Sequence, residues 1–162
     1  MHFLTPSECR EWCGLDAEGF PPRPNREPLH VKASIPRDFT LSLRFCRAVE
    51  RAMRPYRACL LWFTETEIWH SSTNWHLYYR LRQSYGDSRR EEDAPGHLFL
   101  DYEAADFVSF FQVAMLAGFD AHLITDPTGY SRAFLSHDEF VEFTADEGNE
   151  ELVKEFVSLT SP

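Results

Sequence analysis

The chain has 162 residues, of which 43% are hydrophobic and 15% aromatic, and its net charge is −10. This length fits one domain with its own hydrophobic core, and the composition excludes a largely disordered chain. No apolar run approaches the roughly 20 residues of a membrane-spanning helix, and the N-terminus lacks the basic and apolar pattern of a signal peptide. We therefore expect a single globular domain over residues 1–162, located in the cytoplasm and without a membrane partner.

Charge is unevenly distributed along the chain. Residues 1–90 carry 14 basic and 10 acidic side chains, whereas residues 91–162 carry 2 basic and 16 acidic ones. An acidic chain repels nucleic-acid phosphate, so nucleic-acid binding is not expected. The acidic half favours a basic protein partner, while solubility alone is a second explanation for the same charge.

The four cysteines are Cys9, Cys13, Cys46 and Cys59. They show neither CxxC spacing nor a Cys/His pair at zinc-finger spacing. We therefore expect free thiols, no bound metal and no cofactor.

The first half of the chain alternates helix and strand signals. Thr5-Pro6-Ser7-Glu8 is a capping box with proline at the first helical position, which predicts a helix over 6–13. Four prolines within 20–28 predict an extended connector, because proline lacks the amide donor that regular structure needs. The elements expected next are a half-buried strand over 29–35, a helix from its N-cap Asp38 to about Arg54, a central strand over 58–63 and a helix over 75–85.

The second half begins with a charged segment over 87–96, which we expect to be an exposed loop. A helix is predicted over 104–117, with Phe107, Phe110 and Phe111 on its buried face. The other elements expected are strands over 97–102, 120–125, 133–135 and 140–143, a turn or one helical turn over 136–139, and a closing helix over 147–159.

Together these elements predict a mixed α/β, or α+β, single-domain sandwich. We expect a mostly central sheet of five or six strands, four or five helices and a C-terminal β-hairpin.

The richest cluster of aromatic side chains lies near residue 75. Trp75, Tyr78, Tyr79 and Arg82 fall at positions i, i+3, i+4 and i+7, so they form one stripe along a helix. Such a stripe suits the core as well as a recognition surface, because aromatic side chains with polar groups are common in both. Both interpretations stay open at this point.

No motif in the chain specifies a reaction, since a glycine-rich phosphate loop, a nucleophile elbow and HExxH are all missing. His137-Asp138-Glu139 is not expected to bind one metal ion, because adjacent side chains diverge. Ser136-His137-Asp138 is not expected to form a catalytic triad for the same reason. His97, Asp101 and His122 form a metal-ligand set only if the strands that carry them pair. We name no catalytic residue.

Three segments carry a resemblance to known proteins: His97-Leu98-Phe99-Leu100, Gly118-Phe119-Asp120-Ala121-His122-Leu123 and Ser136-His137-Asp138-Glu139-Phe140. With the acidic helix start near Glu103, they resemble uncharacterised bacterial single-domain α/β proteins. The acidic character is similar to that of toxin-neutralising immunity proteins. The resemblance implies a binding role and supplies no catalytic residues.

Our leading hypothesis is a non-enzymatic, acidic domain that binds a basic protein partner, with a toxin as one such partner. The candidate binding residues are Asp138, Glu139, Phe140 and Glu142, together with the stripe Trp75, Tyr78, Tyr79 and Arg82. One alternative is a small-molecule-binding or hydrolytic domain with an aromatic and histidine pocket around Trp69–Tyr79. Another is a homo-oligomeric assembly subunit, in which the aromatic stripe forms the interface.

Overall fold

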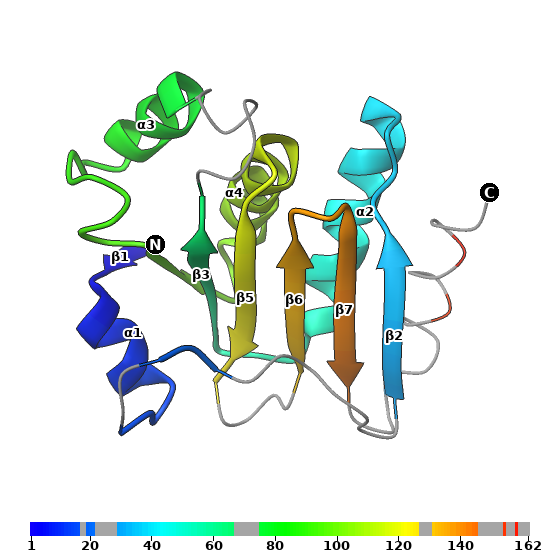
Figure 1. The fold of residues 1–162 in the computed structure, drawn as a ribbon, viewed down its shortest axis with the longest axis horizontal. Helices are drawn as coiled ribbons and strands as arrows, with labels where there is room; N and C mark the ends of the chain where they lie inside the picture. The colour runs from blue at the N-terminus through cyan, green and yellow to red at the C-terminus, as the bar shows by residue number, and fades with distance from the viewer. Residues whose placement is uncertain are drawn as a thin grey trace.

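The computed structural model describes residues 1–16, 19–21, 29–66, 75–126 and 131–145, with the single residues Lys154 and Ser158. These residues hold one antiparallel sheet of seven strands and four helices (Figure 1). The mixed α/β class and the C-terminal hairpin are confirmed. The strand count of five or six is wrong, because β1, which the sequence analysis did not predict, adds a seventh strand.

The strands β1 to β7 span His2–Leu4, Leu29–Ser34, Ala58–Glu65, Gly96–Leu100, Asp120–Thr125, Arg132–Ser136 and Phe140–Ala145. The helices α1 to α4 span Pro6–Trp12, Phe39–Met53, Trp75–Ser84 and Ala104–Ala117. Across the sheet the strands follow the order β1-β4-β3-β5-β6-β7-β2. The first and last strands in this order are both from the N-terminal part of the chain, so long-range pairing builds both edges.

Short-range signals set the helix ends close to the predicted positions. The Thr5 hydroxyl accepts a hydrogen bond from the Glu8 amide, and the Glu8 carboxylate accepts one from the Thr5 amide at 2.7 Å. Asp38 caps α2 by accepting from the amide of Leu41 at 2.9 Å. Gly118 ends α4 in the left-handed conformation with φ 68°, which costs glycine little.

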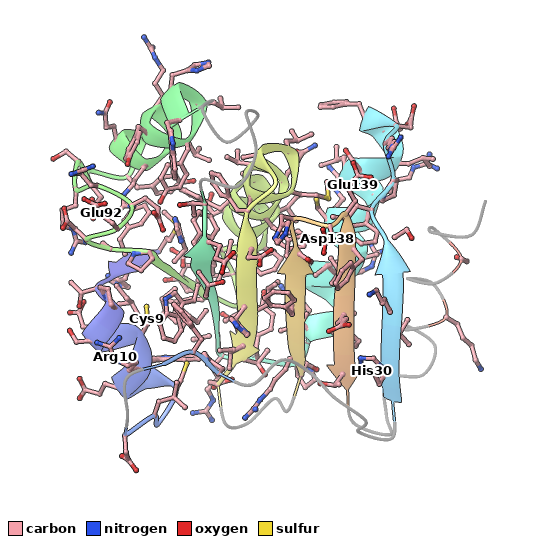
Figure 2. All side chains as sticks on the ribbon, viewed as in Figure 1. Cys9, Arg10, His30, Glu92, Asp138 and Glu139 are labelled. Carbon is pink, nitrogen blue, oxygen red and sulfur yellow. The ribbon has the colours of Figure 1, made fainter. Side chains whose placement is uncertain are left out.

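The helix α1 packs against one face of the sheet, next to β4 and β3. Cys9, labelled in Figure 2, is fully buried there with Leu60 and Trp62. Phe20 crosses the same face and stacks edge-on against Trp62, with 5.1 Å between ring centroids. The rest of the predicted connector, residues 22–28, lies outside the described residues.

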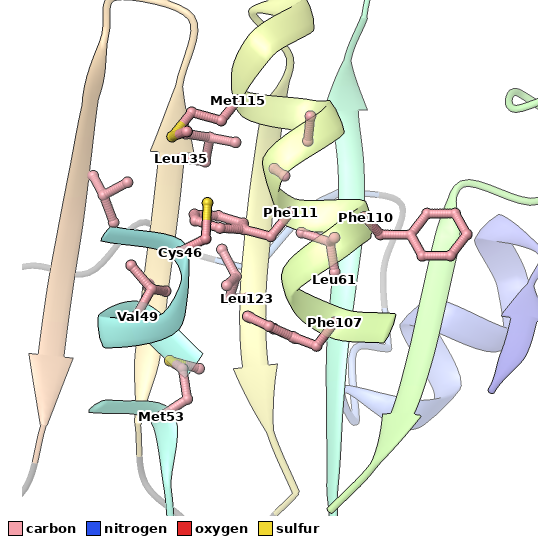
Figure 3. Packing of buried hydrophobic residues seen from close by; sticks show 14 of the residues in the cluster. Cys46, Val49, Met53, Leu61, Phe107, Phe110, Phe111, Met115, Leu123 and Leu135 are labelled. Carbon is pink, nitrogen blue, oxygen red and sulfur yellow. The ribbon is translucent and has the colours of Figure 1, made fainter. Parts of the chain in front are cut away.

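The main core fills the space between the opposite face of the sheet and the helices α2 and α4. Figure 3 shows this layer from close by. Its labelled members from α2 are Cys46, Val49 and Met53, those from α4 are Phe107, Phe110, Phe111 and Met115, and those from the sheet are Leu61, Leu123 and Leu135. The predicted burial of Phe107, Phe110 and Phe111 is confirmed, since each has 0% exposure.

Strand β3 lies between β4 and β5, as its continuous apolar run predicted. Cys59 through Phe63 are buried, because one face meets the main core and the other meets α1 and Phe20. Among the described helices, none is long and apolar enough to cross a membrane. The predicted closing helix over 147–159 lies outside the described elements.

The charged segment 87–96 is only in part the exposed loop that the sequence predicted. Ala94, Pro95 and Gly96 are buried, and Gly96 is the first residue of β4. The reason is the close approach of α1 and β1, which sequence patterns do not reveal. A Cβ atom on Gly96 would lie 2.3 Å from Cys9 Sγ and 2.9 Å from Leu4 Cβ.

We therefore predict that Gly96→Ala lowers the free energy of unfolding by about 1–3 kcal/mol, the usual cost of overpacking. Urea denaturation measures this change. Adding Cys9→Ala should restore part of the loss, because the nearest clashing atom is then gone. Equal stability of Gly96→Ala and the unaltered protein would refute the close approach.

A second prediction concerns the main core. Phe111→Ala should cost about 3–5 kcal/mol of unfolding free energy, because it leaves a cavity and loses transfer energy. Leu116→Ala on the same helix is the matched control, since Leu116 is 55% exposed, and its cost should be several-fold smaller. Thermal melts of both variants test which face of α4 is buried. A similar loss of stability in the two variants would contradict the burial of Phe111.

Candidate functional site

Polar side chains gather at the end of the sheet where β3 and β6 finish and β5 begins. Glu65 is opposite Asp120 in the β3–β5 pairing, and His137 directly follows Ser136, the last residue of β6. Because β3 and β6 both pair antiparallel with β5, the ends of β3 and β6 and the start of β5 lie at the same end of the sheet. Figure 2 shows Asp138 and Glu139 at this end, over β6 and β7.

Asp120 and His137 form the central contact of this region. The Asp120 Oδ1 atom accepts a hydrogen bond from the backbone amide of His137 at 2.6 Å and lies 2.8 Å from the ring Nδ1. The Asp120 side chain is only 3% exposed, whereas that of His137 is 23% exposed. The carboxylate therefore holds the start of the β6–β7 turn in place and leaves one edge of the imidazole accessible.

The turn over 137–139 places two carboxylates at the surface. Glu139 adopts the left-handed conformation with φ 61°, which is uncommon for a residue with a Cβ. Its amide donates to the Ser136 carbonyl at 3.2 Å, and its own carbonyl accepts from the Ile35 amide at 2.9 Å. Its side chain pairs with Arg37 at 2.9 Å. Asp138 is 67% exposed, so its carboxylate faces solvent beside this pair.

The turn forms one wall of a pocket of about 760 Å³. The other walls come from the segment before α2 with the first turn of that helix, and from the last turn of α4. Two large apolar side chains at this pocket are exposed, Phe39 to 68% and Leu116 to 55%. The pocket thus combines exposed apolar surface with the carboxylates of Asp138 and Glu139.

The structure separates the four acidic-end residues that the sequence grouped together. Asp138 and Glu139 line the pocket, whereas Phe140 and Glu142 lie along β7, where both contact Lys32. The Lys32 ammonium lies 3.4 Å from the Phe140 ring centroid and 3.9 Å from the Glu142 carboxylate. Phe140 and Glu142 therefore already have partners within the sheet.

The aromatic stripe faces the core. Tyr78 and Arg82 have 0% exposure, and Trp75 and Tyr79 are half-buried against the same core. The Arg82 Nη1 atom donates to the Tyr78 hydroxyl at 2.6 Å, and that hydroxyl lies 3.0 Å from His97 Nε2. Tyr78 and Arg82 therefore offer no exposed surface to a partner or to a second copy of the chain. The helical spacing is the same for a buried and an exposed stripe, so the sequence could not separate the two.

The proposed set of His97, Asp101 and His122 is also wrong. The strand β3 lies between β4 and β5, so the two histidine-bearing strands do not pair. His97 is opposite Leu61 and His122 is opposite Trp62, and successive residues of a strand point to opposite faces. The two imidazoles are therefore on different sides of the sheet.

Sequence reasoning missed the residues that meet His137. It weighed only Ser136, Asp138 and Glu139, which are near in sequence, whereas the structure brings in Asp120 and Glu65 from other strands. The ligand-type atoms of Glu65, Asp120 and His137 all lie within 4.8 Å of one another. The available signal was a polar residue at the end of each strand, which becomes informative only when the strand order is known.

Comparisons with protein-family models, with curated proteins and with solved structures found no match. The resemblance to bacterial α/β proteins and to immunity proteins therefore stays a prediction.

The buried His97 makes the stability of the fold depend on pH. Burial, and then the charge of Arg82, lower the pKa of His97 to about 3. In the unfolded chain this pKa is about 6.5, so the unfolded state gains a proton first as pH falls. The contribution of neutral His97 is complete above about pH 6.5 and is lost progressively toward pH 3.

We predict that His97→Gln reduces the loss of stability between pH 7.5 and pH 4.5 by about 2–3 kcal/mol, at ~1.4 kcal/mol per pH unit below the unfolded pKa. Urea titrations at the two pH values measure this difference. The matched control is His76→Gln, because His76 is exposed and should leave the pH dependence unchanged. The same pH dependence in all three proteins would show that His97 is not held neutral.

Proposed function

We propose that this protein is a non-enzymatic binding domain that holds a basic protein partner at the pocket beside the β6–β7 turn. The observation that carries the proposal is the exposure of Phe39 and Leu116 at a pocket edged by Asp138 and Glu139. Large exposed apolar side chains that gather beside polar ones mark protein interfaces.

The charges around the pocket favour a cationic partner. Arg37 is balanced by its ion pair with Glu139, and the exposed Asp138 carboxylate adds a negative charge. Glu65 and Asp120 add two more carboxylates at the same end of the sheet, beside His137. Such a surface attracts a basic partner and speeds its approach, an effect that salt screens beyond about 8 Å at physiological ionic strength.

Apolar contacts supply the energy that holds the partner after the encounter. Burying a side chain such as Phe39 or Leu116 contributes about 1.5–3 kcal/mol when it leaves water. These two side chains therefore take the anchoring role, in place of Phe140 and the aromatic stripe among the candidate binding residues. The partner is therefore a basic segment that also carries apolar side chains.

A toxin-neutralising immunity protein in the cytoplasm is the specific form of this proposal, supported by the acidic charge and the small α/β architecture. The alternative of a small-molecule or hydrolytic pocket around Trp69–Tyr79 has less support from residues 75–79, because Tyr78 lies in the core, while residues 69–74 lie outside the described residues. The homo-oligomer alternative now rests on Phe39 and Leu116, and the experiment below separates it.

The test is titration of the labelled protein with a hexapeptide of alternating arginine and leucine, followed by NMR. A peptide of alternating glutamate and leucine is the control ligand. We expect saturable shifts at residues 37–39 and 136–139 with the basic peptide only, weakening as salt rises. Asp138→Lys should weaken binding about tenfold, or ~1.4 kcal/mol. The matched variant Glu92→Lys alters an exposed carboxylate elsewhere and should have little effect.

Two results would overturn the proposal. One is equal binding of both peptides, or shifts that map away from the pocket. The other is a stable dimer in light scattering that Phe39→Asp converts to a monomer, because the pocket would then be an interface between copies of this chain.

A further inference from the structure

We propose that Glu65, Asp120 and His137 form a binding site for one divalent transition metal ion, with zinc as the best fit. The site is adjacent to the pocket but does not depend on the binding function proposed for it. It also replaces the sequence-based expectation of a metal-free protein.

The three residues come from separate parts of the chain and converge at one point. Glu65 ends β3, Asp120 begins β5 and His137 opens the β6–β7 turn. Each offers one ligand atom, and these atoms lie within 4.8 Å of one another. Atoms bound to one ion at about 2.0–2.2 Å are at most about 4.4 Å apart, so small side-chain rotations close the site.

A bulge in β3 places Glu65 in this set. The β3–β5 pairing runs regularly from Cys59 to Phe63, which is opposite Ala121, and then shifts so that Glu65 is opposite Asp120. In a regular ladder Thr64 would occupy that position, and Glu65 would point to the other face of the sheet. Bulges re-aim side chains in this way and occur often beside functional sites.

The imidazole of His137 is oriented as a metal ligand would be. Its Nδ1 atom faces the cluster and lies at hydrogen-bond distance, 2.8 Å, from Asp120 Oδ1. A tetrahedral zinc ion would replace this contact, and the two atoms would move to about 3.3 Å apart. The Nε2 atom of His137 lies 3.6 Å from Asp138 Oδ1. This distance is longer than a hydrogen bond, so Asp138 must move closer to accept the ring N–H that metal-bound histidines usually donate to a carboxylate.

The donor types select the kind of ion. One imidazole nitrogen and two carboxylate oxygens suit zinc or manganese better than calcium or magnesium, which prefer oxygen ligands alone. Two carboxylates also complement the charge of a divalent cation beside the buried Asp120. Glu65 is exposed, so an ion can reach the site from solvent, and three protein ligands leave a coordination position open.

The test is calorimetric titration of zinc chloride into protein freed of metal by chelator and dialysis. We expect one ion per chain, and each of Glu65→Gln and His137→Gln should weaken binding by at least about tenfold. Glu65 is exposed, so its variant separates loss of a ligand from loss of folding. His30→Gln is the matched control, because it removes an exposed histidine at the opposite end of the sheet (Figure 2) and should leave the affinity unchanged.

Cobalt absorption gives a second readout that does not depend on heat. Cobalt bound by the three residues should show visible ligand-field bands that disappear in His137→Gln. Absence of binding at millimolar zinc would overturn the proposal. So would unchanged affinity in both ligand variants, since the ion would then be held by other surface histidines.

Discussion

A carboxylate that is taken out of water needs partners, and Asp120 meets two nitrogen atoms of His137, its backbone amide and its ring Nδ1. This contact links the start of β5 to the turn between β6 and β7. His137 lines the pocket together with the next two residues of the turn, Asp138 and Glu139. The metal site proposed above uses the same two residues, Asp120 and His137, so this contact is shared by the pocket wall and the metal site.

The helices that cover one face of the sheet place further segments beside that contact. Helices α2 and α4 cover one face with an apolar core, and the last turn of α4 and the first turn of α2 come together beside the β6–β7 turn. The rigid layer therefore holds three chain segments that would otherwise be mobile relative to one another. The apolar residues Phe39 and Leu116 lie at the outer ends of these helices, where the core no longer covers them.

Local patterns were sufficient for elements whose signals lie within a few residues. The caps at Thr5 and Asp38, the stop at Gly118 and the apolar run of β3 all predicted boundaries within a residue or two. The strand β1 was missed because three residues are too few to show a period, and it exists through its pairing with β4.

The functional end of the sheet depends on long-range pairing, which single-sequence patterns do not contain. His137 was judged by its neighbours in sequence, while its partner Asp120 lies one strand away. Glu65 joins them through a bulge in β3 that turns its side chain to the other face of the sheet. The residues around Thr64 carry no sequence signal that predicts this bulge. The helical stripe at Trp75 left two interpretations open for another reason, because burial on one side of a helix is set by what packs there.

Hydrogen exchange at the His137 amide tests the central claim most directly. That amide donates to the buried Asp120 carboxylate, so it should exchange far more slowly than an amide in an open turn. In Asp120→Ala the His137 amide should lose this protection, while the amide of Leu61 in the central strand stays protected. Exchange of His137 at the rate of an unstructured peptide, or unchanged protection in the variant, would show that Asp120 does not organise this end of the sheet.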